Sequence, residues 1–251
     1  MKEERYKKIL EKLNRQDIVT IGSLSQELNV AKMTIRRDLT ELEKKGVLKK
    51  VHGGATRNIP EHLENERLYL ERREKNIESK KYIARIAAKI IEEGDVVYIG
   101  PGTTTERILD YVSGKKITVV TNSLSIITKY YNNLNIRMMI LGGIVRNDSE
   151  AITPDYFLDS IRKINVDKCF VGTNGISETK ITTSTFGDGL VEEVLLNNSK
   201  QRYVVTDSSK FNKEAIYSFL NPEILTAVIT DSHIEKKELN RYRKIYNVIN
   251  K

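Results

Sequence analysis

Apolar residues recur at helical spacing three times within the first 57 positions. The three sets are Tyr6, Ile9, Leu10 and Leu13, then Ile21, Leu24 and Leu28, then Ile35, Leu39 and Leu42. Thr20 stands where it caps the second helix, and Gly46 stands where the third helix, over residues 32–45, ends. Apolar and basic residues then alternate over residues 47–52, which predicts a short hairpin. Three helices followed by a hairpin indicate a winged helix-turn-helix.

The outward face of the third helix is basic. At about 100° per residue, Arg36 and Arg37 lie opposite the apolar stripe. Recognition helices read bases from their N-terminal half, where an arginine pairs with O6 and N7 of guanine. We expect Met33 to pack on a thymine methyl group and Lys32 to meet phosphate. The residues expected to contact double-stranded operator DNA are Thr20, Lys32, Met33, Thr34, Arg36, Arg37, Thr40, Lys49, Lys50 and His52. For His52, a packed position in the hairpin is slightly favoured over a phosphate contact.

Positive charge is concentrated in the same segment. Residues 1–57 contain 14 Lys and Arg against 8 Asp and Glu, a net charge of +6, whereas the other residues contain 28 against 26, a net charge of +2. A basic surface confined to one small domain favours a polyanionic partner. A helical protein-interaction domain is the alternative for this segment, but it needs no such segregation of charge.

Short apolar runs alternate with helical stretches in the rest of the chain. The runs are residues 96–99, 117–120, 138–141, 169–171, 203–205 and 227–229, and the helices between them are expected near 106–112, 124–131, 156–164 and 190–199. This alternation predicts a Rossmann-like α/β domain with a largely parallel sheet. The predicted domains are the winged helix-turn-helix over residues 1–57, a charged linker over 58–76 with a helical stretch expected near 68–73, and the α/β domain over 77–251. Ser79 is expected to cap the first helix of the α/β domain.

Glycine, hydroxyl and charged residues follow four of the predicted strands. Ligands of open α/β sheets bind beyond the carboxyl ends of the strands. Backbone N–H groups of glycine turns, hydroxyl donors and a helix N-terminus favour an anion there, and Lys210 adds a cation. The sequence therefore predicts a site for a phosphorylated small ligand. Its expected residues are Gly100, Gly102, Thr103, Thr104, Thr105, Thr121, Asn122, Ser123, Gly142, Gly143, Asp207 and Lys210.

These segments resemble the DeoR family of bacterial transcriptional regulators. The matching segments are Met33-Thr34-Ile35-Arg36-Arg37-Asp38-Leu39, Leu42-Glu43, Lys45-Gly46, His52-Gly53-Gly54-Ala55, Gly102-Thr103-Thr104, Thr121-Asn122-Ser123, Gly142-Gly143, Asp207-Ser208-Ser209-Lys210 and Thr230-Asp231. The resemblance implies a winged helix-turn-helix and a sensor domain that is similar to phosphosugar isomerases and binds sugar phosphates. Ala31 departs from the family's usual capping Ser, and the loss of such a cap costs about 1 kcal/mol.

Within the family, Gly100-Pro101-Gly102-Thr103-Thr104 and Thr183-Ser184-Thr185 are similar to the branch of lactose phosphotransferase system repressors, which respond to tagatose 6-phosphate. Pro154-Asp155 and Glu192 depart from the family pattern, which usually has Gly-Glu at the first position and in many members Lys near the second. An acid in place of a cation weakens the binding of an anion. A different effector, or a second domain that only oligomerises, is therefore an alternative.

The sequence favours a regulator over an enzyme. Asp188, Glu192, Glu193 and Asp207 are available as bases for a phosphosugar isomerase-like enzyme fused to a DNA-binding module, but they form no catalytic signature. We therefore expect a repressor that a phosphorylated sugar releases from its operator. One DNA-binding module offers little contact, so a homodimer or homotetramer is expected.

Other ligands and compartments are not indicated. The sequence shows no cluster of metal-ligating residues, so we expect neither a metal nor a cofactor. The lone Cys169 excludes an internal disulfide and fits a reducing compartment. The charged segment Lys2-Glu3-Glu4-Arg5 has no apolar stretch after it, so we expect no signal peptide, no membrane association and a cytoplasmic location.

Overall fold

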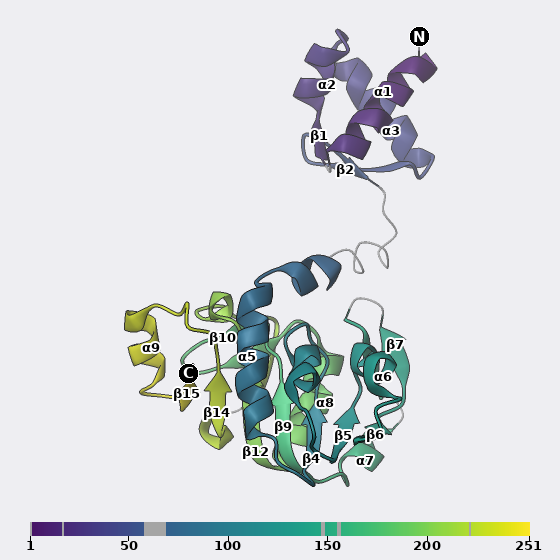
Figure 1. Cartoon of the computed structure of the whole chain (residues 1–251). Helices are drawn as coiled ribbons and strands as arrows, with labels where there is room; N and C mark the ends of the chain where they lie inside the picture. The colour runs from purple at the N-terminus through teal and green to yellow at the C-terminus, as the bar shows by residue number, and fades with distance from the viewer. Residues whose placement is uncertain (1, 17, 58–68, 147–148, 155–156, 221) are drawn as a thin grey trace. The chain divides into compact units, whose positions relative to one another are not determined.

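The computed structural model describes residues 2–16, 18–57, 69–146, 149–154, 157–220 and 222–251. The chain forms two compact units, Met1–Glu64 and Asn65–Lys251, whose helices and strands are labelled in Figure 1. Buried apolar side chains form one core in the first unit and two in the second. Within the described residues, no helix is long and apolar enough to cross a membrane.

The first unit is a three-helix domain with a small antiparallel sheet. Its elements are α1 (Lys2–Arg15), β1 (Ile18–Thr20), α2 (Ile21–Glu27), α3 (Lys32–Lys44), β2 (Leu48–Val51) and β3 (Gly54–Arg57). The strands pair in the order β1-β3-β2. A Cβ atom at Gly54 would lie 2.0 Å from the carbonyl oxygen of Val19, so only glycine lets β1 approach β3 this closely. The winged helix-turn-helix architecture is confirmed, with β1 as a strand that the sequence pattern did not predict.

The interactions at the start of α2 and at both ends of α3 agree with the sequence-based predictions. The backbone N–H of Ser23 donates to Thr20 Oγ1 at 3.1 Å, so Thr20 caps α2 as predicted. No side chain caps α3 at Ala31. The third helix ends at Gly46, whose φ of +70° lies in the left-handed region that glycine adopts without strain.

A buried ion pair joins the first and third helices. Arg5 Nη2 donates to Asp38 Oδ1 at 2.9 Å, and Arg5 Nε donates to the other carboxylate oxygen. The side chain of Asp38 is only 3% exposed, whereas that of Arg5 is 19% exposed. The pair therefore turns an acidic side chain of α3 inward, among the apolar residues Ile35 and Leu39 of the core.

The second unit is an α/β domain built on a seven-stranded parallel sheet. Its strands are β4 (Val96–Ile99), β5 (Ile117–Thr121), β6 (Ile136–Ile140), β9 (Val166–Val171), β12 (Ser199–Val205), β14 (Ala227–Ile229) and β15 (Val248–Ile249). They are ordered β15-β14-β12-β9-β4-β5-β6. The chain thus runs outward from β4 to β6 and then returns to the other side of β4 with β9. The predicted α/β fold class is confirmed.

Helices cover both faces of this sheet, and short strands flank it. The helices are α5 (Ile77–Ile90), η1 (Thr105–Tyr111), α6 (Leu124–Tyr130), α7 (Leu158–Ile161), α8 (Phe186–Asn197), η2 (Ser208–Lys210), η3 (Pro222–Ile224) and α9 (Lys236–Tyr242), where η denotes a 3₁₀ helix. The flanking strands are β7 (Ile144–Arg146), β8 (Ala151–Thr153), β10 (Gly175–Ile176), β11 (Ile181–Thr183) and β13 (Tyr217–Leu220).

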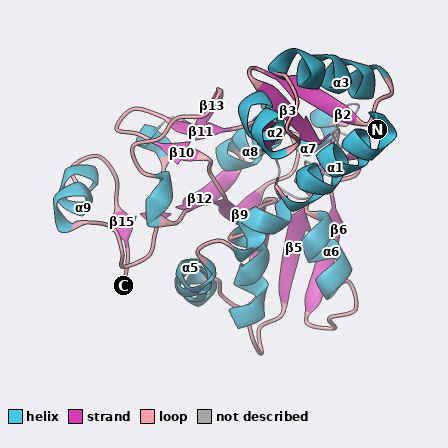
Figure 2. Ribbon diagram, turned by 90° about the horizontal axis from the view of Figure 1, so that it is seen from above, coloured by secondary structure: helices cyan, strands magenta, loops and turns pink. Residues whose placement is uncertain are grey.

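Alternate residues of each central strand enter different cores. In β4, Val97 and Ile99 pack with α5, η1 and α6, whereas Tyr98 packs with α7, α8 and α9. Figure 2 shows α5 and α6 on one side of the sheet and α8 on the other. Burial on both faces explains why these strands are continuous apolar runs in the sequence.

Part of the predicted linker belongs to the second unit. Residues 69–74 are helical, in agreement with the helical stretch expected near residues 68–73. Ser79 does not cap α5, because the helix begins at Ile77 after Asn76, which has a φ of +56°. The hydroxyl of Ser79 instead lies 3.2 Å from His233 Nδ1. Residues 58–68 lie outside the described part of the chain.

The Arg5–Asp38 pair gives a test of the first unit. We expect Asp38→Ala to lower the free energy of unfolding of this unit by about 2 kcal/mol, because it removes two charge-assisted hydrogen bonds while Arg5 still reaches water. Hydrogen exchange of the α1 and α3 amides in the full-length protein measures the change. In the control Lys8→Ala, the exposed pair with Glu4 at 3.7 Å is removed, which costs less than about 0.5 kcal/mol. Equal exchange in the two variants would contradict the role of the buried pair.

Candidate functional site

The outward face of α3 is an exposed basic surface. Lys32, Arg36 and Arg37 are exposed, Met33 is 56% exposed, and Thr34 is half-buried. These residues lie on the N-terminal half of the helix, and the ion pair of Asp38 keeps that carboxylate away from them. The surface is therefore positively charged where a recognition helix would meet base edges.

The hairpin of β2 and β3 is hydrogen-bonded to the same helix. Lys50 Nζ donates to Thr40 Oγ1 at 3.0 Å, and the backbone N–H of Lys50 donates to Glu43 Oε1 at 2.8 Å. Thr40 in turn donates to the carbonyl oxygen of Arg36 at 2.8 Å. Two of the predicted DNA contacts, Thr40 and Lys50, are thus engaged within the unit and fix the hairpin against α3.

The remaining predicted DNA contacts lie at the edge of this surface. Lys49 and His52 are exposed on the hairpin, in or next to β2. The exposed Thr20 accepts a hydrogen bond from Ser23, so its hydroxyl has a capping role. Exposure of His52 favours the phosphate-contact hypothesis over a packed position.

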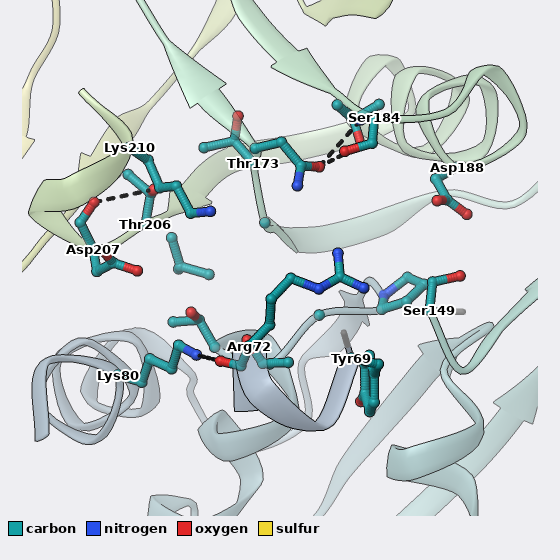
Figure 3. A pocket seen from close by; sticks show the side chains of 18 of the residues that line it. Tyr69, Arg72, Lys80, Ser149, Thr173, Ser184, Asp188, Thr206, Asp207 and Lys210 are labelled. Carbon is teal, nitrogen blue, oxygen red and sulfur yellow. Dashed lines mark hydrogen bonds between the residues drawn. The ribbon is translucent and has the colours of Figure 1, made fainter. Parts of the chain in front are cut away.

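A pocket of about 230 Å³ opens in the second unit, beyond the carboxyl ends of β4, β9 and β12 (Figure 3). These three strands are adjacent in the sheet. The next strand of the sheet after β4 is β5, on one side, whereas the next after β9 is β12, on the other side. Such a switch in strand order separates the loops that follow, which leaves a crevice between them. Five predicted effector residues line this crevice: Gly102, Thr103, Thr104, Asp207 and Lys210.

The predicted turn after β5 has structural roles instead. Thr121 Oγ1 donates to the Ile99 carbonyl oxygen at 2.7 Å. Asn122 accepts from the hydroxyl of Tyr98 at 2.8 Å, and its amide donates to a backbone carbonyl. Ser123 caps α6. All three predicted residues are buried and do not line the pocket, because β5 lies one strand further toward the sheet edge.

Four other predicted residues also lie outside the pocket lining. Gly142 and Gly143 are exposed after the edge strand β6, where a Cβ at Gly143 would meet the Thr153 carbonyl oxygen at 2.0 Å. Thr105 donates to the Gly102 carbonyl oxygen at 2.9 Å and so closes the turn that precedes η1. Gly100 does not line the pocket. The helix predicted after this glycine is the 3₁₀ helix η1.

One end of the pocket is rich in cationic side chains. The basic residues that line it include Arg72, Lys75, Lys80, Lys210 and Lys213. Burial lowers the pKa of Lys80 to about 8. Burial also lowers the pKa of Lys210, although the nearby Asp207 carboxylate acts in the opposite direction. Desolvated amines held close together attract an anion, since its charge would offset their mutual repulsion.

The other end carries two carboxyl groups on α8. Asp188 and Glu192 line the pocket, and Arg146 lies 3.4 Å from Asp188 Oδ2. Burial, and then the Asp188 charge, raise the pKa of Glu192 well above its usual value. Figure 3 shows Asp188 across the pocket from Lys210. The pocket therefore has lysine side chains at one end and, at the other, two carboxyl groups with one arginine, Arg146.

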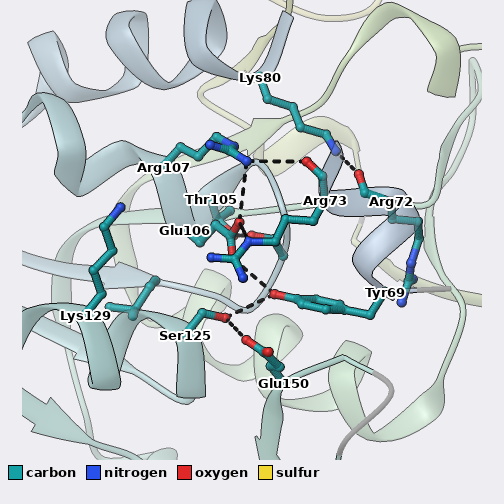
Figure 4. A network of polar contacts seen from close by, with 12 residues as sticks. Tyr69, Arg72, Arg73, Lys80, Thr105, Glu106, Arg107, Ser125, Lys129 and Glu150 are labelled. Carbon is teal, nitrogen blue, oxygen red and sulfur yellow. Dashed lines mark hydrogen bonds and ion pairs between the residues drawn. The ribbon is translucent and has the colours of Figure 1, made fainter. Parts of the chain in front are cut away.

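The segment 69–76 forms one wall of the pocket, and a polar network anchors it (Figure 4). The hydroxyl of Tyr69 donates to Glu106 Oε2 at 3.1 Å, and Arg73 Nε donates to the other oxygen of this carboxylate at 3.1 Å. Asn76 Nδ2 donates to Asp207 Oδ1, also at 3.1 Å. Side chains from a segment that we predicted as linker thus complete the site.

Sequence reasoning missed several other lining residues, including Thr173, Asn174 and Thr206. The signal for Thr173 and Asn174 was present, because Gly172-Thr173-Asn174 follows a strand in the same way as the turns that we selected. Lys80 gave no signal, since a lysine on a helix is ordinarily exposed. Across the residues that the structure describes, no group of three or more His, Cys, Asp or Glu is placed to hold a metal ion.

Two family models match the chain: the DeoR-like helix-turn-helix domain over residues 5–61 and the DeoR C-terminal sensor domain over residues 75–232. The lactose phosphotransferase system repressor of Streptococcus mutans is 34% identical over 251 residues, covering 98% of this chain and 99% of that protein. The protein of the same name from Staphylococcus aureus strain N315 is 34% identical over 94% of both chains.

A solved structure of ribose 5-phosphate isomerase A from Methanocaldococcus jannaschii matches 55% of each chain, with 19% identity and a TM-score of 0.41. The two family models, in contrast, together cover residues in both units of the present structure. The chain belongs to the DeoR family of transcriptional regulators.

Proposed function

We propose that the protein is a cytoplasmic repressor of sugar-metabolism genes, and that a phosphorylated sugar in the pocket releases it from operator DNA. The observation that carries this proposal is a basic recognition helix in the same chain as a pocket with a cationic end and a carboxyl end. The names of the relatives from Streptococcus and Staphylococcus support genes of lactose uptake as the target. We propose tagatose 6-phosphate as the effector, because the resemblance of Gly100-Pro101-Gly102-Thr103-Thr104 to this branch of the family implies it.

Double-stranded DNA fits the surface of the first unit. Arg36 and Arg37 are positioned to read guanine in the major groove, and Lys32 and Lys49 to meet phosphates. A single module of this size makes too few contacts for tight binding. We therefore propose that a homodimer or homotetramer presents two recognition helices to two half-sites.

A sugar phosphate fits the pocket of the second unit. The volume of about 230 Å³ suits a small metabolite, because pockets for drug-sized ligands are about 300–1,000 Å³. Lys80 and Lys210 are placed to bind the phosphate group, together with the hydroxyls of Thr103 and Thr104. Asp188 and Glu192 are left to face the hydroxyl-bearing end of the ligand.

The segment 69–76 supplies a route for control. It follows the linker to the first unit in sequence, and it contributes Tyr69, Arg72, Lys75 and Asn76 to the pocket. A ligand that binds these side chains favours one arrangement of the segment. If the DNA-bound dimer favours a different arrangement of this segment, ligand binding releases the protein from DNA. The ligand shifts the populations of the two arrangements because it binds one of them more tightly than the other.

Base reading by α3 is testable with Arg36→Ala. We expect this change to weaken binding to the operator about 10- to 100-fold at fixed salt, because a bidentate contact with guanine is worth about 1–3 kcal/mol. Binding to nonspecific DNA falls much less. Fluorescence anisotropy with the upstream DNA of this gene and with a scrambled duplex measures both affinities. Lys44→Ala, at the far end of α3, removes the same charge as a control. Equal losses on both duplexes would make Arg36 a phosphate contact.

Operator release is the direct test of the proposed function. We expect tagatose 6-phosphate to lower the operator affinity of the wild-type protein. Lys210→Ala is expected to bind the operator normally but to need at least about tenfold more tagatose 6-phosphate for release, because a charge-assisted contact with phosphate is lost. Titration of the operator complex at fixed salt measures both effects. A wild-type complex that no sugar phosphate releases would overturn the proposal.

Effector affinity is expected to depend on pH through Lys80. Its pKa of about 8 means that the free amine loses its proton between pH 7.5 and 9.5, whereas a phosphate monoester stays doubly charged over that range. Affinity for tagatose 6-phosphate therefore falls by about tenfold as the pH rises, measured by calorimetry. The guanidinium of Lys80→Arg stays charged, so this variant shows a weaker dependence. Lys81→Arg is the exposed control, and an equal slope in both variants would exclude Lys80.

A further inference from the structure

Asp188 and Glu192 present two carboxyl groups to the same end of the pocket. They are four residues apart on α8, a spacing that places both on one face of the helix. Both line the pocket, and Glu192 is only 4% exposed. Glu192 is therefore nearly buried and Asp188 partly exposed, and both lie beside the space that a ligand would occupy.

Each of these carboxyl groups leaves one buried oxygen without a hydrogen-bond partner. Within the described residues, Asp188 Oδ1 and Glu192 Oε2 have no donor or acceptor in reach. A buried polar atom that stays unpaired costs about 1–3 kcal/mol, so native structures rarely retain one without a use. Both atoms belong to side chains that line the pocket but are themselves covered by protein atoms, so a small turn of each carboxyl group brings them to a ligand in the pocket.

The two groups differ in their protein partners. Asp188 Oδ2 accepts from Thr185 Oγ1 at 2.6 Å and lies 3.4 Å from Arg146. No ion pair reaches Glu192 within the described part of the chain, and the hydroxyl of the nearby Tyr98 donates to Asn122 instead. Burial without a cation favours the neutral acid, and this agrees with the raised pKa of Glu192. A neutral carboxyl group is both a donor and an acceptor.

The carboxyl group of Glu192 packs closely against Gly100, next to Tyr98. A Cβ atom at Gly100 would lie 3.4 Å from Glu192 Oε1 and 3.3 Å from the Tyr98 hydroxyl. The absence of a side chain at Gly100 thus leaves room for the carboxyl group at this depth. The cationic end of the pocket, with Lys210, lies on the far side from Asp188 (Figure 3).

We propose that Glu192 and Asp188 recognise the hydroxyl groups of the effector, with the Glu192 carboxyl donating to one ligand oxygen. This inference rests on the proposed function, because it assigns the second end of the same ligand. It assigns the residues that recognise the hydroxyl groups of this phosphate ester at the end remote from the phosphate. Such a site rejects a phosphate ester without the hydroxyl, since the carboxyl groups then stay unpaired.

The test compares Glu192→Leu with Glu192→Gln in the full-length protein. Leu removes both hydrogen-bonding functions at similar volume, whereas Gln keeps one donor and one acceptor in the same shape. Glu193→Gln is the matched control, because this neighbour accepts from Tyr217 at 3.1 Å and does not line the pocket. Calorimetry with tagatose 6-phosphate, fructose 6-phosphate and inorganic phosphate measures the affinities.

We expect Glu192→Leu to lose about tenfold or more in affinity for the hexose phosphate that the wild type binds, with no change for inorganic phosphate. Glu192→Gln and Glu193→Gln are expected to stay within about threefold of the wild type. Unchanged binding of inorganic phosphate shows that a variant is folded. Hexose phosphate binding by Glu192→Leu equal to that of the wild type would overturn the inference and leave the proposed function intact.

Two other outcomes are also decisive. An equal loss in Glu192→Gln and Glu192→Leu would overturn the donor role of Glu192, because a charged carboxylate would then be the recognising group. A wild-type protein that binds neither hexose phosphate would overturn the proposed effector class, and this inference with it. The wild-type measurement therefore separates the failure of the proposed function from the failure of the Glu192 assignment.

Discussion

The pairing of β9 with β4 is the constraint on which the ligand pocket depends. Because the chain returns from the edge strand β6 to the middle of the sheet, the carboxyl ends of β12, β9 and β4 lie side by side. The turns after these strands, residues 206–207, 173–174 and 102–104, are distant in sequence but surround one cavity. A sheet in simple sequential order would put β5 and β6 between β4 and β9, and the turns after β9 and β12 would then lie away from that of β4.

This dependence explains which residues of the site were predictable. The cap at Thr20, the helix end at Gly46 and the apolar stripe through Ile35 follow from local rules, and all three predictions are confirmed. The order of the strands is set by packing between distant segments, which an apolar run in the sequence does not encode. Thr121 and Thr103 have the same side chain after a strand, but only Thr103 lines the pocket.

Two features of the pocket depend on contacts between distant segments. The segment 69–76 is charged and was assigned to the linker, but the partners that anchor it, such as Glu106, lie far along the chain. The sequence analysis treated Glu192 as an acid that replaces a cation and weakens anion binding. In the structure, this residue lies on α8 with Asp188, which faces Lys210 from across the pocket. Under the proposed assignment, Glu192 meets the hydroxyl groups of the ligand and not its phosphate group.

The Arg5–Asp38 pair has a consequence for genetics. Arg5 lies on α1, not on the surface of α3 that is proposed to meet DNA, yet it holds the one acidic side chain in the N-terminal half of that helix inward. Without Arg5, the carboxylate would favour solvent, beside Arg36 and Arg37, and would repel the phosphate backbone. Substitutions at Arg5 are thus expected among alleles that lose operator recognition, at a position that a map of base contacts would not include.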